Sequence, residues 1–129
     1  CSWMQQFSPV AARIMLVCTV VMFVPGVVHH VFCGTVEWFY IRLGRTEEAR
    51  QVILEFFKKT MSTMLACFVG FLVFSVVLLV MVAMGLTALP RWACLLNLLV
   101  LFAVMAPFRI VGTLNIAGAL MLAGLCILL

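Results

Sequence analysis

Three side chains that could do chemistry share one face of a predicted helix in the first third of the chain. His30, Cys33 and Glu37 follow one another at intervals of three and four residues, a spacing that puts them on one helical face, whereas His29 points about 100° away. His30 and Glu37 lie roughly 10.5 Å apart along the axis, too far to bond each other. Ionisable groups within an apolar helix mark candidate functional sites. The spacing therefore indicates a polar site for a ligand or partner side chain.

Two other interpretations of these residues remain open. A histidine, a cysteine and a carboxylate offer three ligand types, but a tight metal site needs a fourth ligand from elsewhere, so we predict no metal here. Alternatively, Glu37 is a carboxylate at the membrane boundary that pairs with an arginine. The chain has no nucleophile elbow, phosphate-binding loop or paired-carboxylate motif. The sequence thus assigns no catalytic residue and no cofactor, and leaves open whether the protein is an enzyme.

Further polar residues lie on neighbouring predicted helices. Arg109 follows a proline, and Asn97 and Asn115 lie on the helices before and after it. Arg109 either contacts lipid phosphate at the interface or turns inward and neutralises Glu37. The tentative ligand-binding set is therefore His30, Cys33, Glu37, Asn97, Arg109 and Asn115.

The composition places these residues in a membrane protein. Of 129 residues, 67% are hydrophobic and 9% are charged, and the mean hydropathy is +1.34. A soluble domain is about 25% charged, so a chain this apolar could not cover its surface with polar groups. Apolar runs of about 18 residues or more are typical of membrane spans. We expect an all-α, polytopic transmembrane helix bundle that forms a single domain.

Four membrane helices and one amphipathic helix are predicted. Ser8 and Pro9 are typical of a helix start. Pro25 should kink the first helix, and Gly44 should end it. The expected spans are about 9–42, 60–85, 92–111 (interrupted at Pro107) and 113–129, with the amphipathic helix at 46–59.

The amphipathic helix has one apolar stripe and one charged side. Thr46 is a good N-cap, and Glu47 and Glu48 fall in the first turn, where the helix dipole favours acids. Glu55 and Lys59 are spaced for an ion pair. The stripe expected to be buried, against protein or lipid headgroups, comprises Ala49, Val52, Ile53, Phe56 and Phe57.

The first two predicted helices can be arranged in two ways. If both continue to the turn at Gly44, residue 60 lies level with about residue 28. Either residues 29–43 then protrude from the membrane beside 46–59, or the amphipathic segment bends to lie flat at the interface. The sequence leaves both arrangements open.

Basic residues indicate an orientation in the membrane. Six of them fall on one predicted side, five within 42–59 plus Arg109, against Arg13 and Arg91 on the other. The positive-inside rule then puts 42–59 in the cytoplasm. We expect an integral protein of the inner, cytoplasmic membrane, and no aromatic–basic interleaving suggests nucleic acid as a partner.

The ends of the chain suggest further helices as partners. The sequence begins at Cys1 and ends within an apolar run at Leu129, as expected for a piece of a longer protein. Asn115, Ala119 and Ala123 recur every four residues, a small-residue stripe that lets another helix approach closely. Partners are then the lipid bilayer and other membrane helices, either upstream helices of the same protein or a second copy. With no C-x-x-C among the six cysteines, we expect no disulfide.

Several stretches resemble an uncharacterised family of multi-pass membrane proteins, a domain-of-unknown-function family. They include Leu-Pro-Arg-Trp-Ala-Cys at 89–94 and Ala-Pro-Phe-Arg-Ile-Val-Gly at 106–112, together with 29–51 and 55–60. The resemblance covers about 29–129 and implies additional helices upstream. It implies no particular substrate or catalytic residue.

Two function classes follow from these observations. In the first, an integral membrane protein of unknown function binds a small molecule or lipid at an intramembrane polar pocket. In the second, a non-catalytic membrane subunit or assembly protein docks partners through its charged hairpin and small-residue face. The classes differ in whether His30, Glu37 and Arg109 converge on a cavity.

Overall fold

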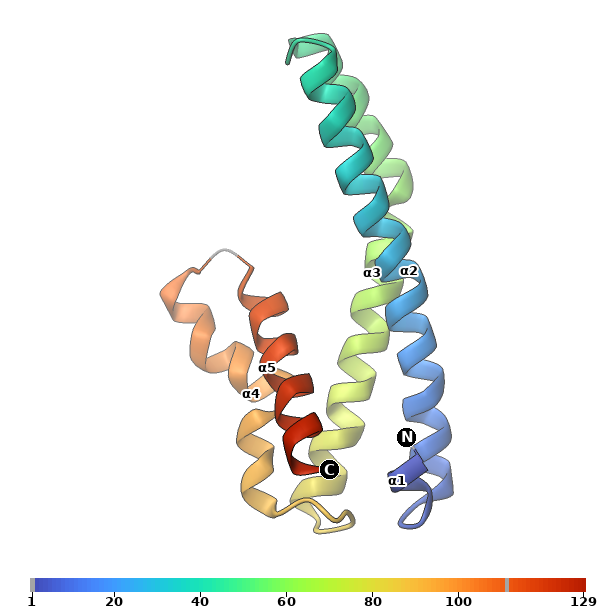
Figure 1. Cartoon of the computed structure of the whole chain (residues 1–129), viewed down its shortest axis with the longest axis vertical. Helices are drawn as coiled ribbons and strands as arrows, with labels where there is room; N and C mark the ends of the chain where they lie inside the picture. The colour runs from blue at the N-terminus through green and yellow to red at the C-terminus, as the bar shows by residue number, and fades with distance from the viewer. Residues whose placement is uncertain (1, 111) are drawn as a thin grey trace. The chain divides into compact units, whose positions relative to one another are not determined.

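The computed structural model describes residues 2–110 and 112–129, and all regular structure within these ranges is helical (Figure 1). This confirms the all-α class. Cys1 and Val111, which the disulfide and third-span predictions included, lie outside the described residues. The elements are α1 (Ser2–Gln5), α2 (Pro9–Arg42), α3 (Glu47–Ala83), the 3-10 helix η1 (Arg91–Leu96), α4 (Leu98–Met105), the 3-10 helix η2 (Ala106–Phe108) and α5 (Thr113–Leu128).

The chain forms two compact units, and the division falls within α2 and α3. The hairpin unit is Val17–Phe71. The terminal unit is Cys1–Leu16 with Leu72–Leu129. Each unit has its own packing, and the predicted site residues are distributed over both.

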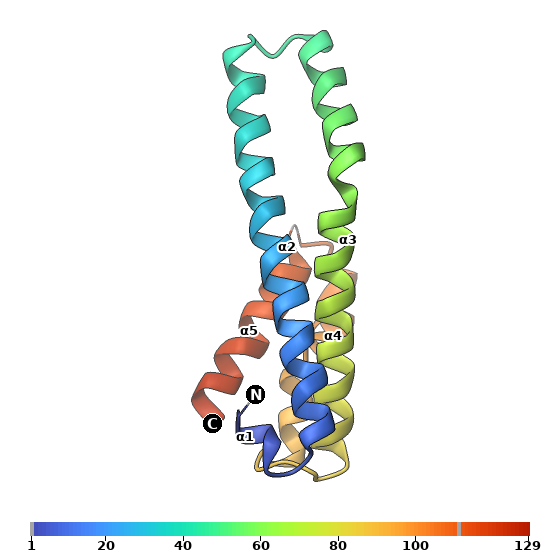
Figure 2. The same cartoon turned by 90° about the vertical axis from the view of Figure 1, so that its right-hand side faces the viewer.

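In the hairpin unit, the arms from α2 and α3 run antiparallel and side by side (Figure 2). The His29 ring meets Thr63, with Nδ1 3.3 Å from Oγ1. Nearer the turn, the Phe32 and Phe56 rings pack edge to face, with centroids 5.3 Å apart. Since α3 is one unbroken helix of 37 residues, the predicted amphipathic helix and second span are continuous. The amphipathic segment therefore stays beside α2 and does not bend away.

The two arms approach most closely at glycines. A Cβ on Gly70 would lie 2.9 Å from the backbone nitrogen of Met22 and 3.0 Å from the carbonyl oxygen of Cys18. A Cβ on Gly26 would lie 3.1 Å from the Cys67 sulfur. Because real Cβ atoms do not approach backbone atoms this closely, any larger residue at 70 would push the helices apart.

The turn of the hairpin follows from local sequence. The N–H of Gly44 donates to Ile41 at 3.1 Å, and the N–H of Arg45 donates to Tyr40 at 3.0 Å. These two bonds form the Schellman motif, with Gly44 at a φ of +74°. The Thr46 hydroxyl then accepts the N–H of Ala49 at 3.2 Å. The predicted cap at Gly44 and N-cap at Thr46 are confirmed.

The start of α2 is also confirmed, and the protein covers part of the apolar stripe of α3. The Ser8 hydroxyl accepts the N–H of Ala11 at 3.2 Å, and α2 begins at Pro9. In α3, Ala49 is buried and Ile53, Phe56 and Phe57 are half-buried, but Val52 is 62% exposed. The protein does not cover Val52, because a single neighbouring helix covers a narrow seam and not a wide face. Its burial against lipid headgroups stays a prediction.

The predicted third span differs most from the structure. It is not one helix over 92–111, because the chain is extended at Asn97, with φ −70° and ψ 142°. The Asn97 amide donates to the carbonyl of Ser75 at 2.9 Å, and its oxygen accepts the N–H of Leu99 at 3.0 Å. Asn97 therefore ends η1 and caps α4. The predicted interruption at Pro107 is present, since α4 ends at Met105 and η2 follows.

The last helix, α5, packs through a different face from the predicted small-residue stripe. Its buried residues include Thr113, Ala117, Met121 and Gly124, whereas Asn115, Ala119 and Ala123 are exposed. A Cβ on Gly124 would lie 2.8 Å from the Leu96 side chain, so small residues do permit a close approach here. The role of the exposed stripe in docking another helix stays a prediction.

Two helices, α2 and α3, are long and apolar enough to cross a membrane. The apolar stretches Leu98–Phe108 and Thr113–Leu128 are shorter than the roughly 20 residues that a spanning helix needs. The described residues 2–110 and 112–129 thus contain two candidate membrane-spanning helices and two shorter apolar ones, and their regular structure is all helical.

Candidate functional site

A groove of about 440 Å³ lies between the two arms of the hairpin unit. Each helix contributes residues spaced i, i+3, i+4 and i+7, so each presents one face to the groove. Cys33 and Glu37 from the predicted ligand-binding set lie in it. The lining residues are Cys33, Val36, Glu37 and Tyr40 of α2, with Arg50, Ile53, Leu54 and Phe57 of α3.

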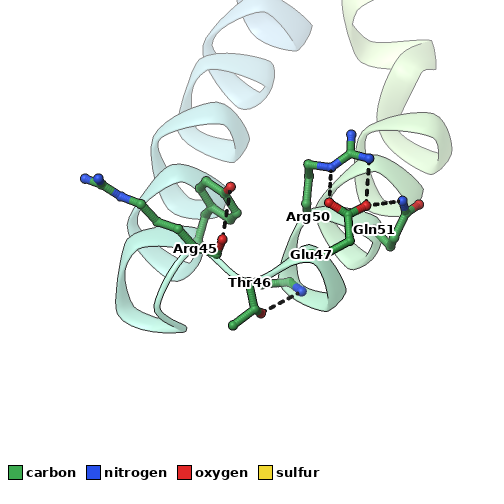
Figure 3. A network of polar contacts seen from close by, with 7 residues as sticks. Arg45, Thr46, Glu47, Arg50 and Gln51 are labelled. Carbon is green, nitrogen blue, oxygen red and sulfur yellow. Dashed lines mark hydrogen bonds and ion pairs between the residues drawn. The ribbon is translucent and has the colours of Figure 1, made fainter.

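Arg50, the basic residue of this groove, is held by its own helix (Figure 3). Its Nε donates to one carboxylate oxygen of Glu47 at 2.8 Å, and its terminal nitrogen donates to the other at 2.7 Å. Gln51 donates to the same carboxylate at 2.7 Å. The hydrogen bonds from Arg50, followed by that from Gln51, lower the pKa of Glu47 to about 2. The charge of Arg50 is therefore compensated within α3.

Glu37, the acidic residue of the groove, is exposed. Among the described residues it forms no ion pair and accepts no hydrogen bond. Arg42, five positions on, instead lies over the Trp38 ring, 5.7 Å from its centroid. Gly34 lies one turn before Glu37, and a Cβ added to it would meet no heavy atom within 4 Å apart from the neighbouring backbone of its own helix. The carboxylate of Glu37 thus stands beside open space.

The two histidines have different environments. His30 is exposed and does not line the groove. His29 is half-buried and faces α3, where its Nδ1 lies 3.3 Å from Thr63 Oγ1 and its ring centroid 6.3 Å from that of Phe57. Residues that alternate at intervals of four and three form the seam of a helix pair, and here they are Met22, Gly26, His29, Cys33, Val36 and Tyr40.

Sequence reasoning also missed Tyr40 and Arg50 as groove residues. Tyr40 is half-buried, and its hydroxyl donates to the carbonyl of Arg45 at 3.4 Å. From the sequence, Arg50 was only one of the five basic residues within 42–59 that indicate the orientation. Both follow from the seam once the two helices are paired about the turn at Gly44, because Tyr40 and Arg50 are then close to level.

The other three predicted residues belong to the terminal unit. Asn97 is buried and holds the break between η1 and α4 through its bonds to Ser75 and Leu99. Arg109 is exposed, follows η2 and has a φ of +52°. Asn115 is exposed on α5. Of these, Asn97 lines a small cavity of about 10 Å³ beside Met121 and Gly124, with room for no more than one water.

Comparison with known proteins gives a family and no described activity. A family described as "Family of unknown function (DUF6796)" matches residues 1–127. The match extends to the first residue, upstream of the stretches on which the sequence resemblance rested. No curated protein and no solved structure matches the chain.

Proposed function

The chain belongs to this family of unknown function, DUF6796, and we propose that it is an integral membrane protein that binds a small amphipathic molecule or lipid between α2 and α3. The observation that carries the proposal is the groove itself, which Glu37 lines and His30 and Arg109 do not. Its walls are mainly apolar, and its carboxylate has no ionic or hydrogen-bonded partner among the described residues. Volumes of about 300–1,000 Å³ with few polar groups are typical of small-molecule sites.

The surfaces of α2 and α3 support insertion in a membrane. Their lengths of 34 and 37 residues correspond to about 51 and 56 Å, against a hydrocarbon thickness of about 30 Å. In the most apolar window of each helix, only 28% and 33% of the residues are buried. A core helix of a soluble protein would hide most of such a window. Exposed side chains such as Val20, Phe23 and Val27 are then suited to contact lipid.

The charges on α3 indicate where the membrane boundary falls. Its last charged residue is Lys59, and residues 60–83 contain none. The groove residues 50–57 therefore lie about 5–15 Å from the start of the uncharged run, on its charged side. The headgroup layer on one side of the bilayer is about 5–7 Å thick. The end of the proposed pocket near Phe57 then lies at the headgroup level, and its end near Arg50 lies beyond the headgroups. An amphiphile could place its head there and its chain towards the hydrocarbon.

The shorter helices are proposed to enter the membrane as well, which retains the four predicted membrane segments. Non-helical backbone is tolerated at membrane depth where the protein itself satisfies it. At the break, the N–H of Asn97 donates to Cys94 at 3.0 Å, and its carbonyl accepts the N–H of Leu101 at 2.9 Å. By the positive-inside rule, we propose that residues 42–59 lie on the cytoplasmic side of the inner membrane.

Native mass spectrometry of the full chain, purified in mild detergent, tests the proposed binding. Leu54→Trp places an indole in the groove, whereas Val52→Trp adds the same side chain on the exposed side of the same helix. We expect wild type and Val52→Trp to retain a bound amphiphile and Leu54→Trp to lose it. Equal retention by all three proteins would show that the groove is not the binding site.

A second candidate function, a membrane subunit that docks partners, is supported by the exposed face of α5. Asn115, Ala119 and Ala123 form a small-residue surface opposite the side that packs in the terminal unit. A partner helix could approach closely there. Disulfide cross-linking of Ala119→Cys to a second copy or to a co-purifying membrane protein, lost in Ala119→Cys/Ala123→Leu, would support this function.

A further inference from the structure

We propose that the groove between α2 and α3 selects a cationic head group, so that its ligand is an amphiphile with a positively charged nitrogen held by Glu37. The inference rests on the proposed function, since it requires that the groove binds an amphiphile. It adds the chemical class of the ligand and the residue that recognises it.

The balance of charge in the groove favours a cation. The lining contains one acid, Glu37, and one base, Arg50. Arg50 already makes two short hydrogen bonds to Glu47, a bidentate arrangement that is among the strongest side-chain pairs. Glu37 has no ionic or hydrogen-bonded partner among the residues that the structure describes. The charge left for a ligand to neutralise is therefore negative.

Arg50 is the one base of residues 42–59 that lines the groove, and Arg45 is exposed at the turn. Arg42 stacks on Trp38. Lys59 pairs with Glu55 at 2.8 Å, and Lys58 lines the separate surface with Glu48 and Glu55. None of the three bases lines the groove. An anionic ligand would have to break the Arg50–Glu47 pair, whereas a cationic ligand finds its partner free.

Two aromatic rings flank the site for a cation. Tyr40 is one turn from Glu37 on the same helix, and its hydroxyl is tied to the carbonyl of Arg45. Phe57 lines the opposite wall and packs edge to face on Phe56, with ring centroids 6.3 Å apart. Ring faces attract ammonium groups, including alkylated ones.

The remaining wall suits a hydrocarbon chain. Val36 is buried, Ile53 is half-buried and Leu54 is exposed, and all three line the groove. With Tyr40 level with Arg50, these three side chains lie close to level with Glu37, and the groove continues past them to Cys33 and Phe57, towards the uncharged part of α3. A ligand with a cationic head and an apolar chain matches both parts of the surface.

Chain-matched ligands distinguish the head group from the chain. The full-length protein is reconstituted in phosphatidylglycerol nanodiscs, whose lipid carries no cationic nitrogen, and the binding of dodecylamine, dodecanol and dodecanoate in excess of empty nanodiscs is measured at about pH 8, where amine and carboxylate are charged. We expect saturable binding in the order amine, alcohol, carboxylate. Glu37→Gln should weaken amine binding about tenfold and leave the alcohol unchanged. Glu48→Gln, an exposed acid outside the groove, should change neither.

The outcomes separate this inference from the proposed function. If all three ligands bind equally and Leu54→Trp abolishes their binding, the groove is confirmed and the cation preference is wrong. If Glu37→Gln weakens amine and alcohol alike, Glu37 shapes the groove and does not recognise the head group, which also overturns the inference. If no ligand binds in excess of empty nanodiscs, the proposed function fails together with the inference.

Discussion

His29 and Thr63 form a polar contact between α2 and α3, with Nδ1 of the ring 3.3 Å from the hydroxyl oxygen. The Thr63 hydroxyl donates its own proton to the carbonyl of Thr60 at 2.7 Å. Its oxygen can therefore only accept from His29, which requires a proton on Nδ1 of the ring. This contact lies where the charged part of α3 gives way to the uncharged run.

Removing the acceptor of this contact should destabilise the hairpin. Thr63→Val keeps the shape of the side chain but leaves the Nδ1–H of His29 without its partner. We expect a loss of about 1 kcal/mol in the free energy of unfolding, at the lower end for an unpaired donor because His29 is only half-buried. Chemical denaturation in detergent measures it.

Two controls bear on the same contact. Thr63→Ser retains the hydroxyl and should behave nearly as wild type. His29→Phe combined with Thr63→Val removes both partners and should cost less than the sum of the single changes. Strict additivity would show that the two side chains do not interact.

The glycines of α2 and α3 provide a test of the helix pairing. Gly70→Ala would bring a methyl group within 3.0 Å of the α2 backbone, and we expect a destabilisation of about 1–3 kcal/mol from forced separation of the helices. Gly34→Ala meets no atom within 4 Å, so the better helix propensity of alanine should stabilise by about 0.5–1 kcal/mol. Thermal unfolding of the two variants should shift in opposite directions. Equal shifts would contradict the pairing at Gly70.

Local features of this fold were readable from the sequence because they depend on residues a few positions apart. The N-cap Ser8 bonds the residue three positions on, and Gly44 and Thr46 end one helix and start the next through bonds to their near neighbours. The ion pair of Glu55 and Lys59 also formed as its spacing predicted, at 2.8 Å.

Features set by a distant part of the chain were not readable in this way. The break at Asn97 depends on the carbonyl of Ser75, which is 22 residues earlier. The choice between His29 and His30 depends on where α3 lies, and so does the exposure of Val52. A helical face can be drawn from spacing alone, but which face is covered depends on the neighbouring helix.

The stability of the turn should depend on pH through Glu47. Hydrogen bonds from Arg50 and Gln51 hold its folded-state pKa at about 2, below its ordinary value of 4.5. A lowered pKa means that the stabilisation is present above pH 4.5 and is lost as the pH falls towards 2. Glu47→Gln lacks this dependence. The difference in thermal midpoint between the wild type and Glu47→Gln should narrow as the pH falls from neutral to 2. A difference that stays constant would show that the hydrogen bonds of Glu47 are not the cause of the difference.

The predicted orientation can be tested at two exposed positions, Glu48 in the first turn of α3 and Ala88 in the loop that follows α3. Six basic residues on the side of residues 42–59 against two on the other favour a cytoplasmic turn at Gly44. Thr87 is unsuitable for labelling because it is buried and its hydroxyl accepts the N–H of Leu89 at 3.2 Å, whereas Ala88 and Glu48 are exposed. In a cysteine-free background, an impermeant thiol reagent applied to intact cells should label Ala88→Cys and spare Glu48→Cys until the membrane is opened. Labelling of both in intact cells would place α3 on one side of the bilayer, and labelling of Glu48→Cys alone would invert the orientation.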